Sequence, residues 1–331
     1  MDVISMKAIQ VSRTGPSSAL EYVDVPTPRP GDGEVLVRTE AISVNYADVR
    51  MRQGLYPEMP PLPFIPGTEA SGTVEAVGSQ ITNLAPGQKV IVMGGECYAE
   101  YVKAGPFSAV PVPEGVDMDA AAVFPTTYLT SHLMLHHFGR IESGQTVLLY
   151  PAAGGIGTAI GQLARLAGIE IIGLADSPEK AAYAKSQGIA HIIDYKKENV
   201  VSRVMEITGG RGVRLILDHV AGPGFSDNFD MLAPLGQVIW FGSIGGELPA
   251  DMASRFNRHF MKGISLRSFH LGSTAKADPM AVFNALVTLL GYLKEGSIRP
   301  VIHRVFPLAE AWKAHDLIES GSVTGKLVLR P

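Results

Sequence analysis

Two patterns of hydrophobic and polar positions divide the chain. Up to about residue 125, short apolar stretches are separated by turns rich in proline and glycine, a pattern typical of β-strands. Strands are predicted at Glu34–Thr39 and Gly72–Ala76, and residues 87–92 predict a turn followed by another strand. Prolines cluster at 26–30 and 57–66, so we expect two long loops there.

From about Pro125 onward, strands and helices alternate. The predicted apolar strands are Thr146–Tyr150, Glu170–Ala175, His191–Tyr195, Arg214–Asp218, Gln237–Gly242 and Ile264–Phe269. The predicted helices between them are Gly157–Ala167, one opening at Ser177-Pro178, Glu198–Thr208 and Phe225–Leu232. Alternation of this kind with continuous apolar strands predicts a parallel, doubly wound sheet.

The last part of the chain changes pattern again. A long apolar helix at Met280–Leu293 is followed by a strand at Val301–Val305, a helix at Leu308–Ser320 and a strand at Lys326–Leu329. This tail has the composition to return to the first domain, although sequence alone leaves its partner open. A length of 331 residues agrees with two domains.

Composition and charge narrow the function classes. The net charge of −4 gives no overall attraction to nucleic acid or to an anionic membrane. A single cysteine, Cys97, excludes a disulfide framework and a four-cysteine zinc lobe. Residues 1–7 lack the features of a targeting signal, and every long apolar stretch is interrupted by polar residues. We therefore expect a cytoplasmic protein without a membrane or nucleic-acid partner.

A glycine-rich turn is the first candidate site. Pro151–Gly157 follows a predicted strand and opens a predicted helix, and it has the form A-x-G-x-x-G. Gly154 would let the backbone approach a pyrophosphate, and Gly157 would let the helix pack closely on the strand. The free N–H groups of the helix start favour an anion. Ala153, Gly154, Gly155, Ile156 and Gly157 are thus predicted to bind a dinucleotide; the alternative is an ordinary tight turn.

Together with this turn, two other segments carry a resemblance to a known family. Val44–Asp48, Gly67–Gly72 and Ala153–Gly157 resemble the medium-chain dehydrogenase/reductase superfamily, and more closely its zinc-free quinone oxidoreductase branch, the zeta-crystallin-like enzymes. Supporting motifs are Gly54–Pro57, Ser177–Lys180 and Gly325–Leu329. The resemblance covers essentially the whole chain. It implies an α/β protein with a GroES-like β-rich catalytic domain (1–125 and 299–331) and a Rossmann cofactor domain with a doubly wound parallel sheet (126–298).

The resemblance also implies that no metal takes part. Zinc-dependent relatives have a cysteine where this chain has Asn45, a histidine at Thr68 and a second cysteine near Thr126. None of the three residues suits a catalytic zinc site, and the nine histidines show no ligand spacing, so we interpret them as surface or satisfied buried histidines. Without a Lewis acid, reduction of an already polarised acceptor is favoured over alcohol oxidation.

By the same resemblance, Asn45 and Tyr46 are the catalytic candidates. They would lie in a loop beside the nicotinamide and the substrate carbonyl, where Tyr46 could donate a hydrogen bond to the developing oxyanion. Alternatively, Tyr46 anchors its loop, and a quinone takes its proton from water. Asp48 and Glu69 are interpreted as buried polar groups that orient loops.

Further cofactor contacts are expected at the ends of predicted elements. Thr130 resembles a position near the nicotinamide ribose, but a threonine at a helix start is an equal alternative. Val220, Gly242 and Ser243 follow two parallel strands at the edge where such sheets bind ligands. Lys326 belongs to the matching C-terminal motif and is assigned to the cofactor with them.

Different residues give conflicting indications of whether the cofactor is NADPH or NADH. Asp176 lies 19 residues after Gly157, near the place of an acid that binds a ribose 2′-hydroxyl and selects NADH. The resemblance instead aligns Ala175 with that place, and it implies that Ser177, Lys180 and Tyr195 surround a 2′-phosphate. We therefore expect NADPH and no zinc.

The sequence thus predicts an NADPH-dependent, zinc-independent reductase of quinones or related conjugated carbonyls. One alternative is an enoyl-thioester reductase of the same branch. An alternative of another class is a non-catalytic, NADPH-binding structural protein. Because an apolar edge strand near Ile264–Phe269 is a liability when it stays unpaired, we also expect a homodimer.

Overall fold

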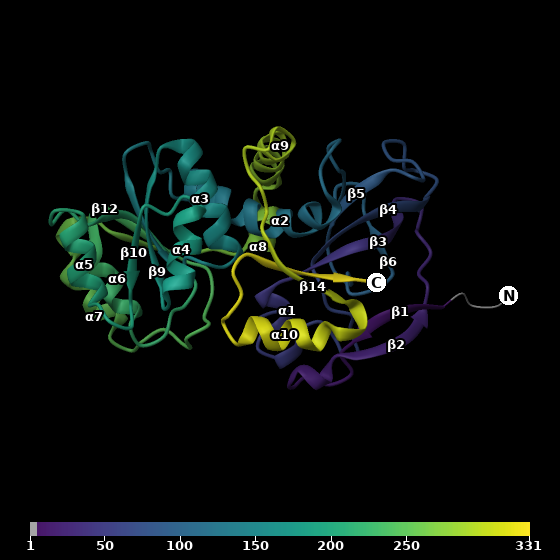
Figure 1. Ribbon diagram of the computed structural model, residues 1–331, viewed down its shortest axis with the longest axis horizontal. Helices are drawn as coiled ribbons and strands as arrows, with labels where there is room; N and C mark the ends of the chain where they lie inside the picture. Colours follow the sequence, from purple (N-terminus) through teal and green to yellow (C-terminus); the bar gives the residue numbers. More distant parts are fainter. Residues whose placement is uncertain (1–4) are drawn as a thin grey trace. The chain divides into compact units, whose positions relative to one another are not determined.

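The computed structural model describes residues 5–331 and contains two compact units (Figure 1). One unit is the chain up to Thr126 together with Arg299–Pro331, and the other is Thr127–Ile298. Residues 1–4, on which part of the expectation about a targeting signal rests, lie outside the described residues. Within residues 5–331, no helix has both the length and the apolar character that crossing a membrane requires.

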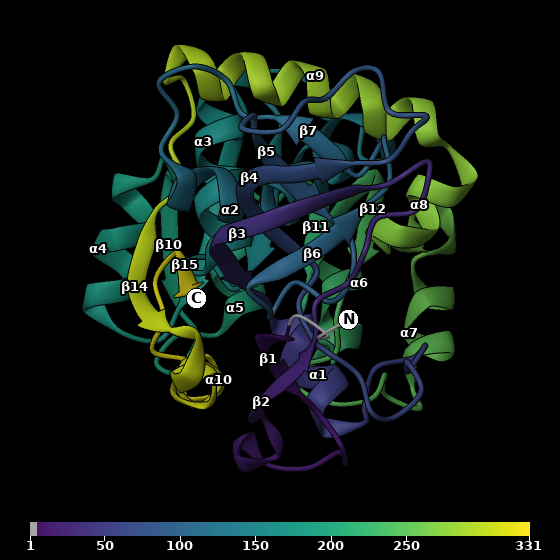
Figure 2. The same cartoon turned by 90° about the vertical axis from the view of Figure 1, so that its right-hand side faces the viewer.

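The first unit is built on a seven-stranded sheet. Its strands, in spatial order, are β14 (Ile302–Pro307), β15 (Lys326–Arg330), β3 (Val35–Val44), β4 (Glu69–Val77), β5 (Lys89–Met93) and β7 (Ala109–Pro111), and β6 (Tyr101–Ala104) also pairs with β3 (Figure 2). A separate antiparallel pair is formed by β1 (Ser5–Gln10) and β2 (Glu21–Pro26). Strand β15 runs antiparallel to β3, with Leu327 opposite Val44, so the C-terminal tail does return to the first unit.

Two helices of this unit lie side by side. Helix α1 (Tyr46–Gln53) starts where β3 ends, and α10 (Ala311–Glu319) follows the short 3-10 turn η5 (Leu308–Glu310). A second 3-10 turn is η1 (Ser17–Ala19). Arg52 of α1 and Glu319 of α10 form an ion pair of 2.8 Å. Helix α1 is not among the predicted elements: the sequence predicted a loop after β3, and the structure corrects this.

The second unit contains a six-stranded sheet in which every neighbouring pair is parallel. The spatial order is β10 (His191–Asp194), β9 (Glu170–Ala175), β8 (Thr146–Tyr150), β11 (Val213–Asp218), β12 (Leu232–Trp240) and β13 (Ser265–Ser268). In sequence order this is 3-2-1-4-5-6, the order of a doubly wound dinucleotide-binding sheet. The predicted α/β fold class, with one β-rich and one parallel-sheet domain, is confirmed.

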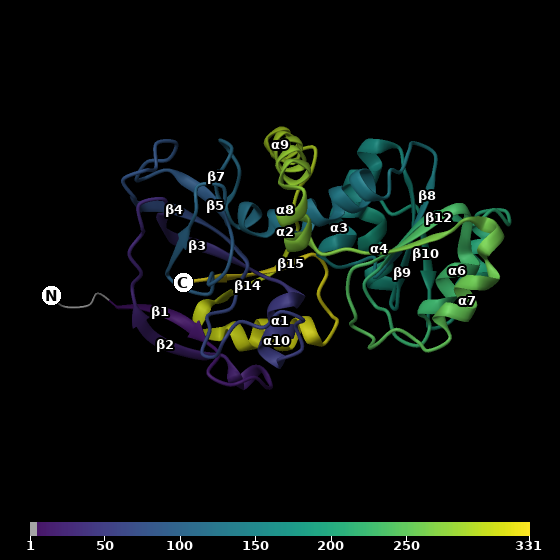
Figure 3. The same ribbon diagram turned by 180° about the vertical axis from the view of Figure 1, so that it is seen from behind.

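Helices cover both faces of this sheet. Figures 1 and 3 show α3 (Gly155–Ala167) and α4 (Pro178–Ser186) on one face, with α6 (Asn228–Met231) and α7 (Met252–Arg258) on the other. The remaining helical elements are α5 (Val200–Ile207), η3 (Phe225–Asp227), η4 (Phe260–Lys262), α8 (Leu271–Ala277) and α9 (Pro279–Glu295). Helix α2 (Met118–His132), in which the division between the units falls, leads into the π-helical η2 (Leu133–Phe138).

Strand β12 differs most from its predicted bounds. It starts at Leu232, not Gln237, and the helix predicted at Phe225–Leu232 is the turn η3 followed by the single-turn α6. Pro234 and Gly236 read as a turn in the sequence. In the structure they lie in an irregular part of the strand, where the register against β11 shifts and Leu235 has φ of 60°.

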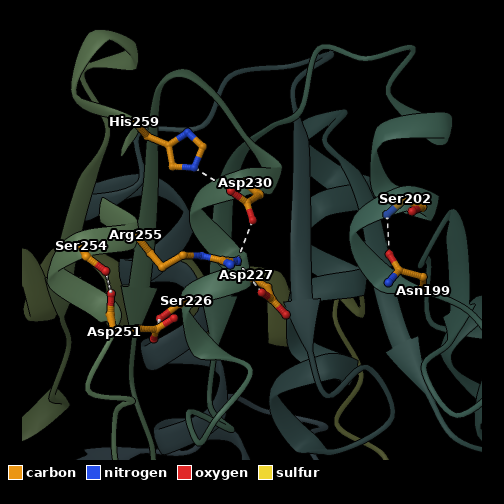
Figure 4. A network of polar contacts seen from close by, with 9 residues as sticks. All are labelled: Asn199, Ser202, Ser226, Asp227, Asp230, Asp251, Ser254, Arg255 and His259. Atoms are coloured by element: carbon orange, nitrogen blue, oxygen red, sulfur yellow. Dashed lines mark hydrogen bonds and ion pairs between the residues drawn. The ribbon is translucent and has the colours of Figure 1, made fainter. Parts of the chain in front are cut away.

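A polar network ties the segment between β12 and β13 to its own unit (Figure 4). One guanidinium nitrogen of Arg255, in α7, lies 2.5 Å from Asp227 and 2.7 Å from Asp230. A carboxylate oxygen of Asp230 also lies 2.7 Å from Nε2 of His259, and the hydroxyl of Ser226 donates a hydrogen bond to Asp251 at 2.7 Å. Four contacts thus fix this segment.

Candidate functional site

The glycine-rich turn lies between β8 and α3, as predicted. Gly154 is the N-cap of α3 and offers no side chain to cap the first turn, so the helix starts with uncapped backbone N–H groups. A Cβ at Gly157 would lie 1.9 Å from the carbonyl oxygen of Ala152, whereas one at Gly154 would meet nothing within 4 Å. Gly157 is therefore required for packing, and Gly154 leaves open space in front of the helix start. Ala153, Gly155 and Ile156 complete this turn, and Ala153 is buried.

A second group of predicted residues gathers around Asp176, at the carboxyl ends of β9 and β10. The ammonium of Lys180 lies 2.6 Å from one carboxylate oxygen, and that of Lys196 lies 3.4 Å from the other. Hydrogen bonding to Lys180 holds the pKa of Asp176 below its usual value. Ser177 caps α4 by accepting the backbone N–H of Lys180, as predicted. Burial, and then the charge of Asp176, raise the pKa of Tyr195.

The loops after β11 and β12 meet at the same edge of the sheet. The buried carboxylate of Asp218 accepts the backbone N–H groups of Val220 at 2.7 Å and Ala221 at 2.9 Å, and burial raises its pKa. The N–H of Gly245 donates to the carbonyl of Val220 at 2.7 Å, which joins the two loops. Figure 1 places β9, β10 and β12 in this single sheet.

Gly242 and Ser243 lie directly after β12 in these joined loops. A Cβ at Gly242 would come within 1.9 Å of the His219 ring, which stacks on Phe241. Only glycine at position 242 therefore allows the end of β12 to lie this close to the histidine ring. The structure thus brings Val220, Gly242 and Ser243 together, and their contact with a cofactor stays a prediction.

Thr130 is buried in α2, close to the end of that helix. The alternative that made it a helix-start threonine is wrong, because α2 starts at Met118. Pro125, a residue that disfavours helix interiors, lies inside α2.

The first unit contains a buried polar cluster at the end of β3. Asn45 is the N-cap of α1, and its amide nitrogen donates to Glu69 at 2.9 Å and to Thr68 at 3.2 Å. Its amide oxygen accepts the ammonium of Lys326 at 2.5 Å. Glu69 also accepts the backbone N–H of Thr126 at 2.7 Å. Every polar atom of the Asn45 side chain therefore has a partner inside the protein.

Asp48 extends this cluster toward α10. One oxygen of its fully buried carboxyl accepts the backbone N–H of Asn45 at 2.8 Å and the hydroxyl of Tyr98 at 3.3 Å. Tyr98 also contacts His315 at 3.1 Å. Burial raises the pKa of Asp48 to about 7 and lowers that of His315 to about 3. The orienting role expected of Asp48 and Glu69 agrees with these contacts.

Tyr46 is the first residue of α1 and is half-buried. The loop predicted for Asn45 and Tyr46 is thus a helix start, which fixes the backbone of both residues. The prediction that buried histidines are satisfied is wrong in part: within residues 5–331, Nδ1 of both His132 and His315 is buried without a partner.

Sequence reasoning missed how Lys326, Tyr98 and His315 join the Asn45 cluster. Lys326 and Asn45 are 281 residues apart, and Tyr98 and His315 are 217 apart. Only an Asn-x-x-Asp spacing at 45–48, which is typical of a capping box, signalled part of this arrangement.

Comparisons with known proteins agree with this fold. Residues 31–130 match the family model of the alcohol dehydrogenase GroES-like domain, and residues 155–288 match that of the zinc-binding dehydrogenases. A quinone oxidoreductase of Pseudomonas aeruginosa is 34% identical, and the alignment covers 98% of this chain and 99% of that protein. The quinone oxidoreductase of Sus scrofa is 32% identical, with 98% and 97% covered.

Solved structures give the same result. The quinone oxidoreductase of Pseudomonas syringae pv. Tomato has a TM-score of 0.92 at 32% identity, with 98% of this chain and 100% of that chain covered. An Escherichia coli quinone oxidoreductase complexed with NADPH has a TM-score of 0.91 at 28% identity, with the same coverage. This chain belongs to the quinone oxidoreductase branch of the medium-chain dehydrogenase/reductase superfamily, and it is an oxidoreductase.

The family model of the second unit includes zinc in its description, so the fit of zinc was judged on the residues present. At the Asn45 cluster, an amide oxygen, a backbone carbonyl oxygen and one carboxylate surround an ammonium group. Catalytic zinc takes thiolate, imidazole and carboxylate ligands. Among residues 5–331, no three histidine, cysteine or acidic side chains gather to hold a metal. The Asn45 cluster therefore does not fit zinc.

Proposed function

We propose that this protein is an NADPH-dependent, zinc-independent reductase that transfers a hydride to quinones or related conjugated carbonyls. The observation that carries the proposal is the Asn45 cluster, whose amide, carboxylate and ammonium groups do not make up a set of zinc ligands. Without a Lewis acid, the acceptor must already be polarised, as quinones are. The branch of the superfamily to which the chain belongs supports the same acceptor class.

The second unit is proposed to hold NADPH. The uncapped start of α3 would receive the pyrophosphate, next to Ala153, Gly154, Gly155, Ile156 and Gly157. Bound NADPH would supply the hydride. The solved Escherichia coli relative was crystallised with this cofactor.

Charge around Asp176 supports NADPH over NADH. One carboxylate faces two ammonium groups, those of Lys180 and Lys196, so the group has a net positive charge that suits a 2′-phosphate. Ser177 and Tyr195 border the same place. Thr130, Val220, Gly242 and Ser243 complete the proposed cofactor contacts, whereas the ammonium of Lys326, which the sequence assigned to the cofactor with them, is bound to Val44 and Asn45.

Asn45 and Tyr46 are the proposed catalytic residues. The amide of Asn45 is fully hydrogen-bonded within the protein. Asn45 therefore acts by fixing the start of α1, beside which the acceptor would bind. Tyr46 is half-buried at the helix start, and its hydroxyl would donate a hydrogen bond to the acceptor oxygen. Replacement by phenylalanine should change kcat only a few-fold with a quinone and more with an enone, since the enone anion is less stable and needs the proton more.

An acceptor panel tests the proposal. Oxidation of NADPH is followed at its absorbance with naphthoquinone, an enone and crotonyl thioester, and the panel is repeated with NADH. We expect turnover with the quinone and a preference for NADPH. A preference for the crotonyl thioester would identify an enoyl-thioester reductase, and tight NADPH binding without any turnover would identify a non-catalytic binding protein.

The assembly and place of action are proposed with the same reaction. We propose a cytoplasmic homodimer, with a catalytic domain of residues 1–125 and 299–331 and a cofactor domain of 126–298. Support for the dimer comes from β13, an edge strand of the parallel sheet, whose outer backbone groups have no partner strand within residues 5–331. Sedimentation at equilibrium should give twice the chain mass of 35.3 kDa.

A further inference from the structure

Lys326 is a buried cation in the first unit. It is the first residue of β15 and is 8% exposed. Its ammonium donates to the carbonyl oxygen of Val44 at 2.9 Å and to the amide oxygen of Asn45 at 2.5 Å, and it lies 3.6 Å from Glu69. Three oxygen atoms therefore surround the three donors of one ammonium group.

The partners of Lys326 are themselves fixed from other directions. One oxygen of the fully buried Glu69 carboxylate accepts the Asn45 amide nitrogen, and the other accepts the backbone N–H of Thr126. The second amide hydrogen of Asn45 goes to Thr68. Since Lys326 binds the amide oxygen and Glu69 binds the amide nitrogen, only one orientation of the Asn45 amide satisfies both.

The cluster also balances its charge without a metal. A buried carboxylate is costly unless a cation pairs with it, and the ammonium of Lys326 lies 3.6 Å from an oxygen of Glu69. The resemblance to the family implies that zinc-dependent relatives have ligands at Asn45, at Thr68 and near Thr126. The ammonium is bound to Asn45 itself, so it occupies the surroundings that a metal would need.

We propose that Lys326 is a positioning residue whose ammonium is the built-in cation of this site: it orients the Asn45 amide and neutralises Glu69. This inference goes beyond direct cofactor contact by Lys326, and it rests on the proposed metal-independent reaction. Lys326 acts through Asn45 and the start of α1, where Tyr46 begins the helix.

Chemical rescue tests the proposal. Lys326→Ala leaves a cavity lined by oxygen atoms of Val44, Asn45 and Glu69, which suits a free ammonium ion. We expect kcat for NADPH-dependent quinone reduction to fall by about tenfold or more with KM for NADPH within about threefold. Ammonium chloride should restore a substantial part of kcat saturably, whereas tetramethylammonium chloride at equal ionic strength should not. Lys103→Ala, which removes an exposed lysine paired with Glu34, is the matched control.

Melting temperatures test the role of the same cation independently of enzyme activity. Ammonium should raise the melting temperature of Lys326→Ala and leave that of the wild type unchanged. Glu69→Gln and Lys326→Met should each lower the melting temperature, and the double variant should be at least as stable as either one, because it leaves no unpaired charge. If Lys326→Ala does not fold, the stability of this double variant still tests whether Lys326 and Glu69 pair.

The outcomes separate this inference from the proposed function. A wild type that reduces no quinone or enone contradicts the proposed function, while the response of the melting temperature to ammonium still tests Lys326. A folded Lys326→Ala variant that keeps its kcat, or that loses it without rescue by ammonium, overturns the inference. Additive losses of stability in the double variant overturn it as well.

Discussion

At the scale of single residues, the environment of a carboxylate decides its role. Asp176 lies near the place of an acid that binds a ribose 2′-hydroxyl, but two lysines already neutralise it. Asp48 has no such cation within hydrogen-bonding distance among the described residues, and burial dominates its pKa. The first carboxylate therefore belongs to a positive surface, whereas burial shifts the second toward its neutral form.

Replacing Lys180 by alanine should weaken NADPH binding by about 1–2 kcal/mol, or about 5- to 30-fold, as expected for a partly exposed charge-assisted contact. NADH has no 2′-phosphate, so its affinity should barely change. Asp176→Asn, which removes the carboxylate and leaves both lysines, is the matched variant and should not weaken NADPH. Fluorescence titration of both cofactors measures this. Equal losses for NADPH and NADH would assign Lys180 to packing.

The carboxyl of Asp48 should make stability depend on pH. Its pKa is about 7 in the folded protein against about 3.9 when unfolded, so the folded state holds more protons between these values. Stability relative to Asp48→Asn should therefore fall as pH rises from 4 to above 7, by about 4 kcal/mol in total. Urea unfolding of both proteins at several pH values measures the difference. A difference that is constant with pH would show that Asp48 is ionised throughout.

At the scale of elements, the start of α3 combines a packing requirement with a binding surface. The two requirements fall on different glycines of one turn. Gly157 faces the carbonyl of Ala152, and Gly154 faces open space. The same separation occurs at β12, where Gly242 passes the His219 ring and Ser243 follows it. In each case, one glycine allows a close approach, and its neighbour belongs to the proposed cofactor contacts.

Two alanine variants separate these roles. Gly157→Ala should lower stability by about 1–3 kcal/mol, because its Cβ overlaps the Ala152 carbonyl and the turn must move. Gly154→Ala should keep stability within about 0.5 kcal/mol, because its Cβ meets no atom, yet it should lower NADPH affinity by placing a methyl group before the helix start. Thermal unfolding and cofactor titration measure the two effects. If Gly154→Ala binds NADPH normally, the pyrophosphate does not approach this turn closely.

At the scale of the whole molecule, the sequence predicted local features better than it predicted contacts between distant residues. Strand β9 has its predicted bounds, Glu170–Ala175, and Ser177 caps α4 as predicted, because apolar runs and capping residues act over a few positions. Helix α1 was missed even though Asp48 accepts the N–H of Asn45 in the manner of a capping box.

The site shows the same limit. Nothing in the sequence around Lys326 indicates that its ammonium meets Asn45, 281 residues earlier. That contact depends on β15 pairing with β3, with Leu327 opposite Val44. Strand pairing between distant segments is set by the packing of the whole domain, which a local pattern does not encode. The resemblance to the family supplied the importance of both residues, and the structure supplied their contact.

Removal of metal should leave the activity of this protein unchanged. A divalent ion about 4 Å from the fixed ammonium of Lys326 would be repelled by about 8 kcal/mol at an effective dielectric constant of about 20. Asn45, Thr68 and Thr126 offer no thiolate or imidazole to offset that repulsion. Exhaustive chelation should therefore keep the rate of NADPH-dependent quinone reduction, and elemental analysis should find no stoichiometric zinc. A zinc-dependent dehydrogenase treated in parallel should lose its activity and serves as the control. Stoichiometric zinc whose removal abolishes the activity of this protein would contradict both the metal-independent reaction and the role of Lys326 as its built-in cation.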